Sequence, residues 1–221
     1  ERLMRTERLA LVGRMLAQVT HEVRNPLNAM SLNAEMLSDE LTSTEGTAML
    51  ETITGEIRRL ENITGRYLHL SRKRVPQMAR TSPHSMIARI VDVERAAMKA
   101  SGVTPHLRGE SQQIVEIDVD AVERTLRNLL RNSVEAGAKN IEINSHIQSQ
   151  YLTIVVSDDG PGMSMDEAEQ AFDPFFTTKA RGTGLGLAIA RQELEEIGGK
   201  LEHSNVVDGG AEFKLSVPIN A

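Results

Sequence analysis

The 221-residue sequence contains no cysteine and no tryptophan, and aromatic residues make up only 3% of it. Without cysteine, disulfides, thiolate metal sites and a cysteine nucleophile are all excluded. No apolar stretch approaches the roughly 20 residues of a membrane-spanning helix, and no basic segment followed by an apolar one opens the chain. We therefore expect this fragment in the cytoplasm, although the sequence leaves open whether the whole protein is anchored in a membrane.

Acidic groups outnumber basic ones only in the later part of the chain. Residues 1–82 carry 12 basic and 10 acidic groups, so the remaining 13 basic and 21 acidic groups give the rest a charge of −8. This negative charge argues against nucleic acid as a partner. The chain starts at Glu1 inside a helical pattern, and we expect it to be cut from a longer protein whose upstream region is absent here.

Apolar residues in the first third of the chain follow the three-and-four spacing of a coiled coil. One run comprises Leu9, Val12, Leu16, Val19, Val23, Met30 and Leu37, and a second comprises Leu50, Ile53, Ile57, Leu60 and Tyr67. The polar stretch between the runs predicts a helical hairpin. Two helices with such narrow apolar seams cannot bury both faces alone, so we expect a homodimer in which two hairpins form a four-helix bundle.

The helical pattern stops before Pro76, because proline cannot continue a helix. We predict a helical domain at residues 1–75, a linker at 76–82 and a second domain at 83–221. Alternating helical and strand patterns make the second domain mixed α/β. Its expected elements are a helix at Ser85–Ala100, strands near residues 114–117, 141–145 and 151–157, and a half-exposed hairpin strand through Phe213, Leu215 and Val217.

His21 lies two residues from both Val19 and Val23, so it points away from the apolar seam and is expected on the surface. By itself it would be an ordinary solvated histidine. Its neighbours include Glu22, Asn25 and Pro26, and the proline removes the amide that would bond the carbonyl of Glu22. A titratable side chain therefore adjoins a local irregularity of the helix.

Three groups of polar residues in the second domain have spacings that suggest a site. Asn128 and Asn132 are four residues apart on one face of a helical pattern whose buried face carries Leu126, Leu129 and Leu130. Asp158 follows the strand at 151–157 and precedes Gly160 and Gly162, where an ordinary turn is the simpler explanation. Three of the four phenylalanines lie within residues 172–176, shortly before Lys179.

A glycine-rich segment, Gly182-Thr183-Gly184-Leu185-Gly186, opens the helical pattern Leu187–Ile197, which Gly198 and Gly199 end. Converging backbone amides and a helix N-terminus favour a polyphosphate at such a place. The segment is not a P-loop, because no Lys-Ser or Lys-Thr follows it. It is not a dinucleotide-binding fingerprint either, because Ile189 stands where a glycine is required.

The sequence His21-Glu22-Val23-Arg24-Asn25-Pro26-Leu27 resembles the H-box of the histidine kinase family's dimerisation domain. The segments around Asn128–Asn132, Asp158–Gly162, Phe172–Phe176 and Gly182–Gly186 resemble the N, G1, F and G2 boxes of the same family, in the same order. The resemblance covers essentially the whole chain. It identifies the chain as similar to the catalytic core of a sensor histidine kinase of a two-component system, with the sensor region missing.

The resemblance implies a reaction and two protein partners. ATP would phosphorylate His21, with Glu22 as the general base, and the phosphoryl group would pass to an aspartate on the receiver domain of a response regulator. Asn25 matches the position that orients water in the family's phosphatase reaction. The implied partners are therefore a second copy of the chain and the response regulator.

The resemblance also implies ATP and Mg²⁺ as ligands of the second domain. Asn128 and Asn132 would approach the phosphates, and Asn132 would ligate the metal. Asp158 would accept the adenine amino hydrogen, Gly160 and Gly162 would admit the base, and Lys179 would reach the polyphosphate. Gly182, Thr183, Gly184, Leu185 and Gly186 would cradle the phosphates. The implied fold is the α/β sandwich shared with gyrase, mismatch-repair and heat-shock chaperone ATPases.

Two alternatives to a kinase are considered. One is a core that acts mainly as a phosphatase of the receiver. The other is a nucleotide-gated dimer like the chaperone and gyrase ATPases, without protein kinase activity. The second is disfavoured, because those relatives carry a catalytic acid where Asn128 stands and lack a helix with His21-Glu22. Glu135 stands where some family members carry a basic residue, and we assign it no role.

Overall fold

The structure is a computed structural model that describes residues 23, 27–34, 36–38, 43–69, 76–109, 113–179, 183–206 and 209–219. The chain divides into two units, Glu1–Lys73 and Arg74–Ala221. The predicted residues His21, Glu22, Asn25 and Gly182 lie outside the described residues.

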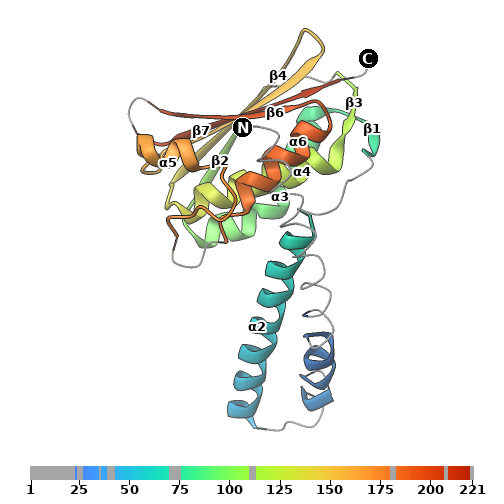
Figure 1. The fold of residues 1–221 in the computed structure, drawn as a ribbon, viewed down its shortest axis with the longest axis vertical. Coiled ribbons are helices and arrows are strands. Elements are labelled where there is room, and N and C mark those ends of the chain that lie inside the picture. Colours follow the sequence, from blue (N-terminus) through green and yellow to red (C-terminus); the bar gives the residue numbers. More distant parts are fainter. Residues whose placement is uncertain are drawn as a thin grey trace. The chain divides into compact units, whose positions relative to one another are not determined.

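The first unit is helical where it is described (Figure 1). Residues 27–34 and 36–38 are helical and pack against helix α2 (Thr44–His69), as the hairpin pattern predicted. The apolar side chains buried between them are Leu27, Ala34, Leu50 and Ile57, with Val23 packed alongside. Several residues of the predicted seams, namely Met30, Leu37, Ile53 and Leu60, are instead exposed in the single chain. A pair of helices buries only one stripe on each, which leaves the neighbouring stripe uncovered.

The second unit contains a five-stranded sheet in the order β2-β4-β5-β7-β6. Strands β2 and β4 run parallel, and the other neighbours are antiparallel. The strands are β2 (Thr104–Arg108), β4 (Asn140–Gln148), β5 (Tyr151–Asp158), β6 (Lys200–Asn205) and β7 (Ala211–Pro218). Apolar side chains alternate along β4 and β7, so one face of the sheet is buried and the other is polar.

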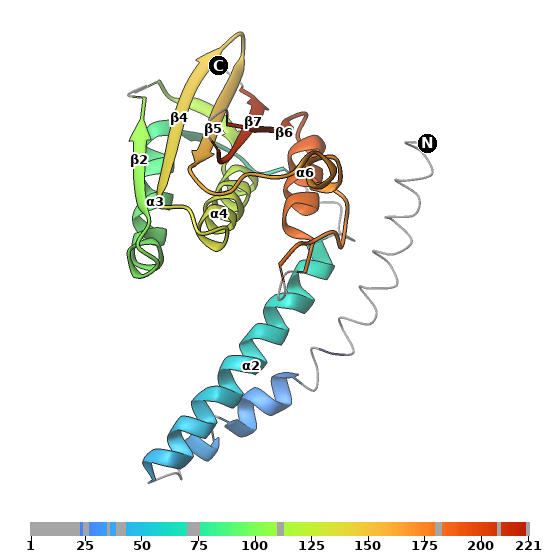
Figure 2. The ribbon, with the colours of Figure 1, turned by 90° about the vertical axis from the view of Figure 1, so that its left-hand side faces the viewer.

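Helices cover one face of this sheet (Figures 1 and 2). They are α3 (Pro83–Ala100), α4 (Val119–Glu135) and α6 (Gly186–Glu196), and a short helix α5 (Met165–Gln170) follows β5. Their apolar side chains and those of the buried sheet face form one core that includes Leu126, Leu129, Ile141, Ile154 and Leu215. The α/β architecture predicted from the sequence is confirmed. No helix in the described part of the chain is long and apolar enough to cross a membrane.

The stretch expected to be a linker contains a strand, which corrects that prediction. Within residues 76–82, β1 (Met78–Thr81) pairs antiparallel with β3 (Val115–Asp118) in a separate two-stranded sheet. The side chains of β1 are mostly exposed, so the segment has no apolar alternation that would indicate a strand. Strands β2 and β6 and helix α5 were not predicted either. Each is short, and β2 and α5 bury few or no side chains.

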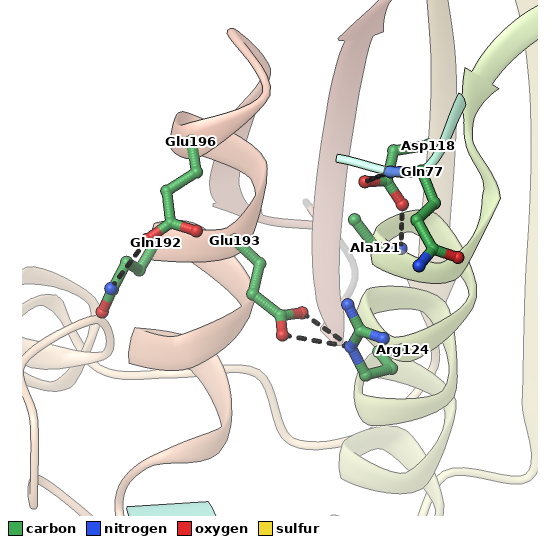
Figure 3. A network of polar contacts seen from close by, with 7 residues as sticks. All are labelled: Gln77, Asp118, Ala121, Arg124, Gln192, Glu193 and Glu196. Carbon is green, nitrogen blue, oxygen red and sulfur yellow. Dashed lines mark hydrogen bonds and ion pairs between the residues drawn. The ribbon is translucent and has the colours of Figure 1, made fainter. Parts of the chain in front are cut away.

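Asp118 joins the end of β3 to the start of α4 (Figure 3). Its carboxylate is buried and caps α4 by accepting a hydrogen bond from the backbone N–H of Ala121, at 3.0 Å. The second carboxylate oxygen accepts from the backbone N–H of Gln77, at 3.1 Å. One side chain therefore begins the helix and holds the segment that enters the second unit.

We predict that Asp118→Ala lowers the free energy of unfolding of the chain by about 1–2 kcal/mol, because the helix loses its cap and the N–H of Gln77 loses an acceptor. Denaturant unfolding followed by circular dichroism measures this change. Asp118→Asn is the control, since its amide oxygen can still cap the helix, and it should lose much less. Equal losses in both variants would contradict the capping role.

Candidate functional site

Helix α4 presents two different faces, as its sequence predicted. Leu126, Leu129 and Leu130 are fully buried against the sheet. Asn128 and Asn132 lie on the other side and are half-buried. An amphipathic helix with one face in the core must turn its polar side chains toward whatever covers its opposite face. In this unit, Asn128 lies against Gly186 at the start of α6, and Asn132 accepts a hydrogen bond from Lys179.

Ion pairs connect α4 to the helices on either side of it. Arg124 on α4 contacts both carboxylate oxygens of Glu193 on α6 through its Nε, at 3.0 and 3.1 Å (Figure 3). Arg127 on α4 donates to Glu94 on α3 at 2.6 Å. Glu193 is largely buried, so its pairing with Arg124 is less screened by solvent than a surface ion pair. These contacts connect α4 to the later part of α6 and to α3.

Asp158 stands at the end of β5 with its carboxylate buried. Ser133 on α4 donates its hydroxyl to Asp158 Oδ2 at 2.6 Å. The backbone N–H groups of Gly160 and Ala211 donate to Asp158 Oδ1, at 3.0 and 3.2 Å. A carboxylate held from three elements has one orientation, so it can act as a directional acceptor for a ligand.

Asp159, the residue after Asp158, has a structural role. This exposed carboxylate accepts from the backbone N–H groups of Lys139 and Asn140 at 2.7 and 2.9 Å, and from the side-chain amide of Asn140 at 2.8 Å. The hydrogen bonds from the backbone and side chain of Asn140, followed by that from Lys139, lower the pKa of Asp159 from 3.8 to about 2. Asp159 thus fastens the loop after β5 to the start of β4.

The loop that contains Gly160 and Gly162 is also fastened to β6. Asn205 accepts from the backbone N–H of Met163 at 3.0 Å and donates to its carbonyl at 2.6 Å. His203 on the same strand packs its ring on Phe213, with the ring centres 5.1 Å apart. Burial lowers the pKa of His203, although the charge of Asp158 opposes that shift.

The glycine-rich segment lies against both the phenylalanine segment and α4. Gly184 has a φ of +64°, and a Cβ placed on it would lie 2.3 Å from the carbonyl carbon of Phe175. Its carbonyl accepts from the backbone N–H of Phe175 at 2.9 Å. A Cβ on Gly186, at the start of α6, would lie 2.5 Å from Asn128 Oδ1. Glycine is therefore required at position 184, where the backbone would clash, whereas a side chain at position 186 would displace the side chain of Asn128.

The amide nitrogen of Asn128 is buried, and within the described residues it has no hydrogen-bond partner. Its side chain lies against Gly186, which begins α6. A buried donor without a partner costs free energy unless a ligand or water supplies an acceptor. The N-terminus of α6 adds positive dipole at the same place, so the missing acceptor is expected to be anionic.

Lys179 contacts the end of α4. Its ammonium donates to Asn132 Oδ1 at 3.3 Å and to Glu135 Oε2 at 2.8 Å. Arg131 donates to the other oxygen of Glu135, at 2.7 Å. Burial raises the pKa of Glu135, but the hydrogen bonds and charges of Lys179 and Arg131 outweigh it and leave the pKa below 4.5.

Five of the predicted site residues within the described part of the chain lie on α4 or contact it, namely Asn128, Asn132, Asp158, Lys179 and Gly186. Ser133 of α4 donates a hydrogen bond to Asp158, and Asn132 of α4 accepts one from Lys179. Asn128 of α4 lies against Gly186. Sequence analysis missed Ser133, although a polar residue on the buried face of α4 is a usable signal. It also missed the contact of Asn205 with Met163 and that of Glu135 with Lys179, because these pairs are 42 and 44 positions apart in the sequence.

Two family models match the chain. Residues 11–75 match the His Kinase A (phospho-acceptor) domain, and residues 117–221 match the histidine kinase-, DNA gyrase B- and HSP90-like ATPase family. One match lies in each predicted domain, and together they include His21 and every predicted site residue of the second domain. The chain belongs to the sensor histidine kinase family.

Similar proteins are named histidine kinases. The signal transduction histidine-protein kinase AtoS of Escherichia coli is 32% identical over 99% of this chain. The chain spans 37% of the length of AtoS and 41% of that of the sensor protein kinase PilS of Pseudomonas aeruginosa, which is 28% identical over 95% of this chain. This histidine kinase core is thus less than half the length of these relatives.

Solved histidine kinase structures share the fold. ThkA, in a complex with the response regulator protein TrrA, superposes with a TM-score of 0.69 at 28% identity, over 98% of this chain and 64% of that chain. Full-length ShkA in complex with AMPPNP superposes with a TM-score of 0.85 over 95% of this chain and 46% of that one. At 21% identity, the likeness to ShkA concerns the fold alone.

We predict that the Asp159 carboxyl group titrates near pH 2 rather than near 3.8. Because its pKa is lowered in the folded state, the stabilisation it supplies is present above about pH 3.8 and is lost as the pH falls through about 2. A nuclear magnetic resonance titration of its side-chain carbon measures the midpoint. Asn140→Ala removes one donor and should raise it. A midpoint near 3.8 in the parent chain would contradict these hydrogen bonds.

Proposed function

We propose that this chain is the catalytic core of a sensor histidine kinase that phosphorylates itself on His21 with ATP and passes the phosphoryl group to an aspartate of a response regulator. The observation that carries the proposal is the convergence of Asp158, Asn128 and Lys179 on α4, in a unit that belongs to the histidine kinase-like ATPases. The match of residues 11–75 to a phospho-acceptor domain supports His21 as the acceptor.

ATP fits the chemistry of the site from one end to the other. Asp158 is a fixed acceptor for the adenine amino group, which guanine lacks at that position. At the other end, Asn128 lacks an acceptor, the N-terminus of α6 is positive, and Lys179 carries a cation. Gly184 and Gly186 let the glycine-rich segment approach the Phe175 backbone and the Asn128 side chain closely at this end. The site therefore suits a ligand with an amino-bearing base at one end and several negative charges at the other.

The proposed reaction uses His21 and Glu22 of the first unit and ATP bound in the second unit. A neutral ring nitrogen of His21 attacks the γ-phosphorus, a nitrogen–phosphorus bond forms, and the bond to the β-phosphate oxygen breaks to release ADP. Glu22 takes the proton from the other ring nitrogen. Transfer to the receiver aspartate then breaks the nitrogen–phosphorus bond and restores the free imidazole.

Asn132 fits a role as a ligand of Mg²⁺. Its amide oxygen faces the ammonium of Lys179, so it already lies where a cation is held. Within the described residues, no group of three or more His, Cys, Asp or Glu side chains could hold a metal. A magnesium ion that keeps water and phosphate oxygens as its other ligands needs only one such protein oxygen. When bound, it would neutralise charge on the polyphosphate.

A receiver domain is the proposed second substrate. The structure of ThkA with the response regulator protein TrrA, which covers nearly all of this chain at 28% identity, supports such a partner here. A nucleotide-gated dimer without kinase activity is less well supported, since Asn128 cannot act as the catalytic acid or base of those ATPases. Phosphatase activity stays a prediction from Asn25.

Incubation of the chain with γ-labelled ATP should give a phosphoprotein that is stable to base and labile to acid. His21→Ala should abolish the label and leave binding of a non-hydrolysable ATP analogue unchanged. Asp158→Asn should weaken that binding by about tenfold to a hundredfold, because asparagine offers one acceptor oxygen instead of two, and Ser133, Gly160 and Ala211 already donate to this side chain. Autoradiography and calorimetry measure the two effects.

Label that persists in His21→Ala would remove His21 as the acceptor. Unchanged binding of the analogue in Asp158→Asn would remove Asp158 from the nucleotide site. Binding without any label in the parent chain would favour the nucleotide-gated dimer over the kinase.

We also propose that the first unit forms a homodimer. On α2, the apolar residues Met49, Ile53 and Leu60 repeat at heptad spacing beside the buried pair Leu50 and Ile57, yet they are exposed. Met30 and Leu37 repeat in the same way on the preceding helix. A second hairpin can cover both exposed stripes and complete a four-helix bundle.

Sedimentation equilibrium should therefore give the mass of a dimer for the parent chain. Ile53→Glu should shift the chain toward monomer, because Ile53 is 54% exposed in one copy and would be buried by the second. Val93→Glu is the matched control, since Val93 is 60% exposed on α3 of the other unit. A dimer that tolerates Ile53→Glu would place the interface elsewhere.

A further inference from the structure

The cation proposed to receive the polyphosphate is already neutralised. Lys179 lies 2.8 Å from Glu135 and 3.3 Å from Asn132 Oδ1, and its side chain and that of Glu135 are 36% and 38% exposed. The ammonium of Lys179 therefore contacts two side chains in the last turn of α4. It covers the asparagine oxygen proposed for Mg²⁺ as well as a carboxylate that has no part in the proposed chemistry.

The carboxylate of Glu135 lies at a helix C-terminus, where positively charged neighbours are needed to stabilise it. Glu135 is the last residue of α4, and the C-terminus of a helix carries partial negative charge. Arg131 binds one carboxylate oxygen at 2.7 Å and Lys179 binds the other at 2.8 Å. If Lys179 leaves, Arg131 remains as a partner. The Lys179 contact can therefore exchange without leaving an isolated charge.

We propose that Glu135 sets the affinity for ATP by competing with the polyphosphate for Lys179. This inference rests on the proposed function of the site. ATP would take the ammonium over from Glu135, and the same movement would uncover Asn132 Oδ1 for Mg²⁺. Glu135 is thus a residue that acts through Lys179 and does not touch the nucleotide.

The competition has a definite sign. The energy of the Lys179–Glu135 contact is present in the free protein and absent once the ammonium is on the phosphates, so it is subtracted from binding. Half-exposed ion pairs are weak, so removing this one should tighten binding about two- to fivefold. An effect that operates through Lys179 must vanish when Lys179 has no charge.

The test is a double-mutant cycle on the whole chain, with calorimetric titration of AMPPNP in the presence of Mg²⁺. Glu135→Gln should bind AMPPNP about two- to fivefold more tightly than the parent. Lys179→Met should bind about tenfold more weakly, because a charge-assisted contact to phosphate is lost. The double variant should bind as Lys179→Met does. Because the glutamine change removes a carboxylate from a helix C-terminus, it should not unfold the protein.

Glu142→Gln is the matched control, since it also removes one negative charge that pairs with an arginine, Arg108, at 2.7 Å, but on the sheet. It should leave AMPPNP binding unchanged. Equal tightening by Glu135→Gln with and without Lys179, or tightening by Glu142→Gln, would show simple repulsion and overturn the inference. No tightening by Glu135→Gln while Lys179→Met weakens binding would also overturn it. If Lys179→Met has no effect, the proposed role of Lys179 itself fails.

Discussion

The second unit depends on the burial of one face of α4. Leu126, Leu129 and Leu130 commit that face to the sheet, and ion pairs to Glu94 and Glu193 hold the helix between α3 and α6. Because the apolar face packs against the sheet, the polar face of α4 must lie on the side away from the sheet. The glycine-rich segment and Lys179 meet that face at Asn128 and Asn132, whereas the end of β5 meets the helix at the buried Ser133. A single amphipathic helix therefore aligns parts of the chain that are far apart in sequence.

The two ends of the proposed nucleotide site differ in how firmly they are held. Asp158 receives hydrogen bonds from Ser133, Gly160 and Ala211, so its orientation is determined before any ligand arrives. Among the described residues, the ammonium of Lys179 is held by a half-exposed carboxylate and an amide oxygen. A fixed acceptor such as Asp158 can select a ligand without the cost of ordering its side chain on binding. Lys179, in contrast, has to leave its present partners to contact a polyphosphate.

The residues of the proposed chemistry are divided between the two units. The proposed acceptor, His21, belongs to the stretch that matches the phospho-acceptor domain, while the proposed ATP site is built within residues 117–221. The proposed phosphoryl transfer therefore involves residues of both units.

The sequence by itself determined the helical hairpin, the α/β unit, the buried leucines of α4 and the order of the motifs, because periodicity and local spacing act over a few residues. It did not reveal β1, whose exposed side chains leave no pattern, and it therefore assigned residues 76–82 to a linker. Only the tertiary structure decided that Ser133 orients Asp158, that Asn128 faces Gly186, and that Glu135 binds Lys179. Those contacts join residues 25 or more positions apart, and no local pattern encodes which distant loop will meet a helix face.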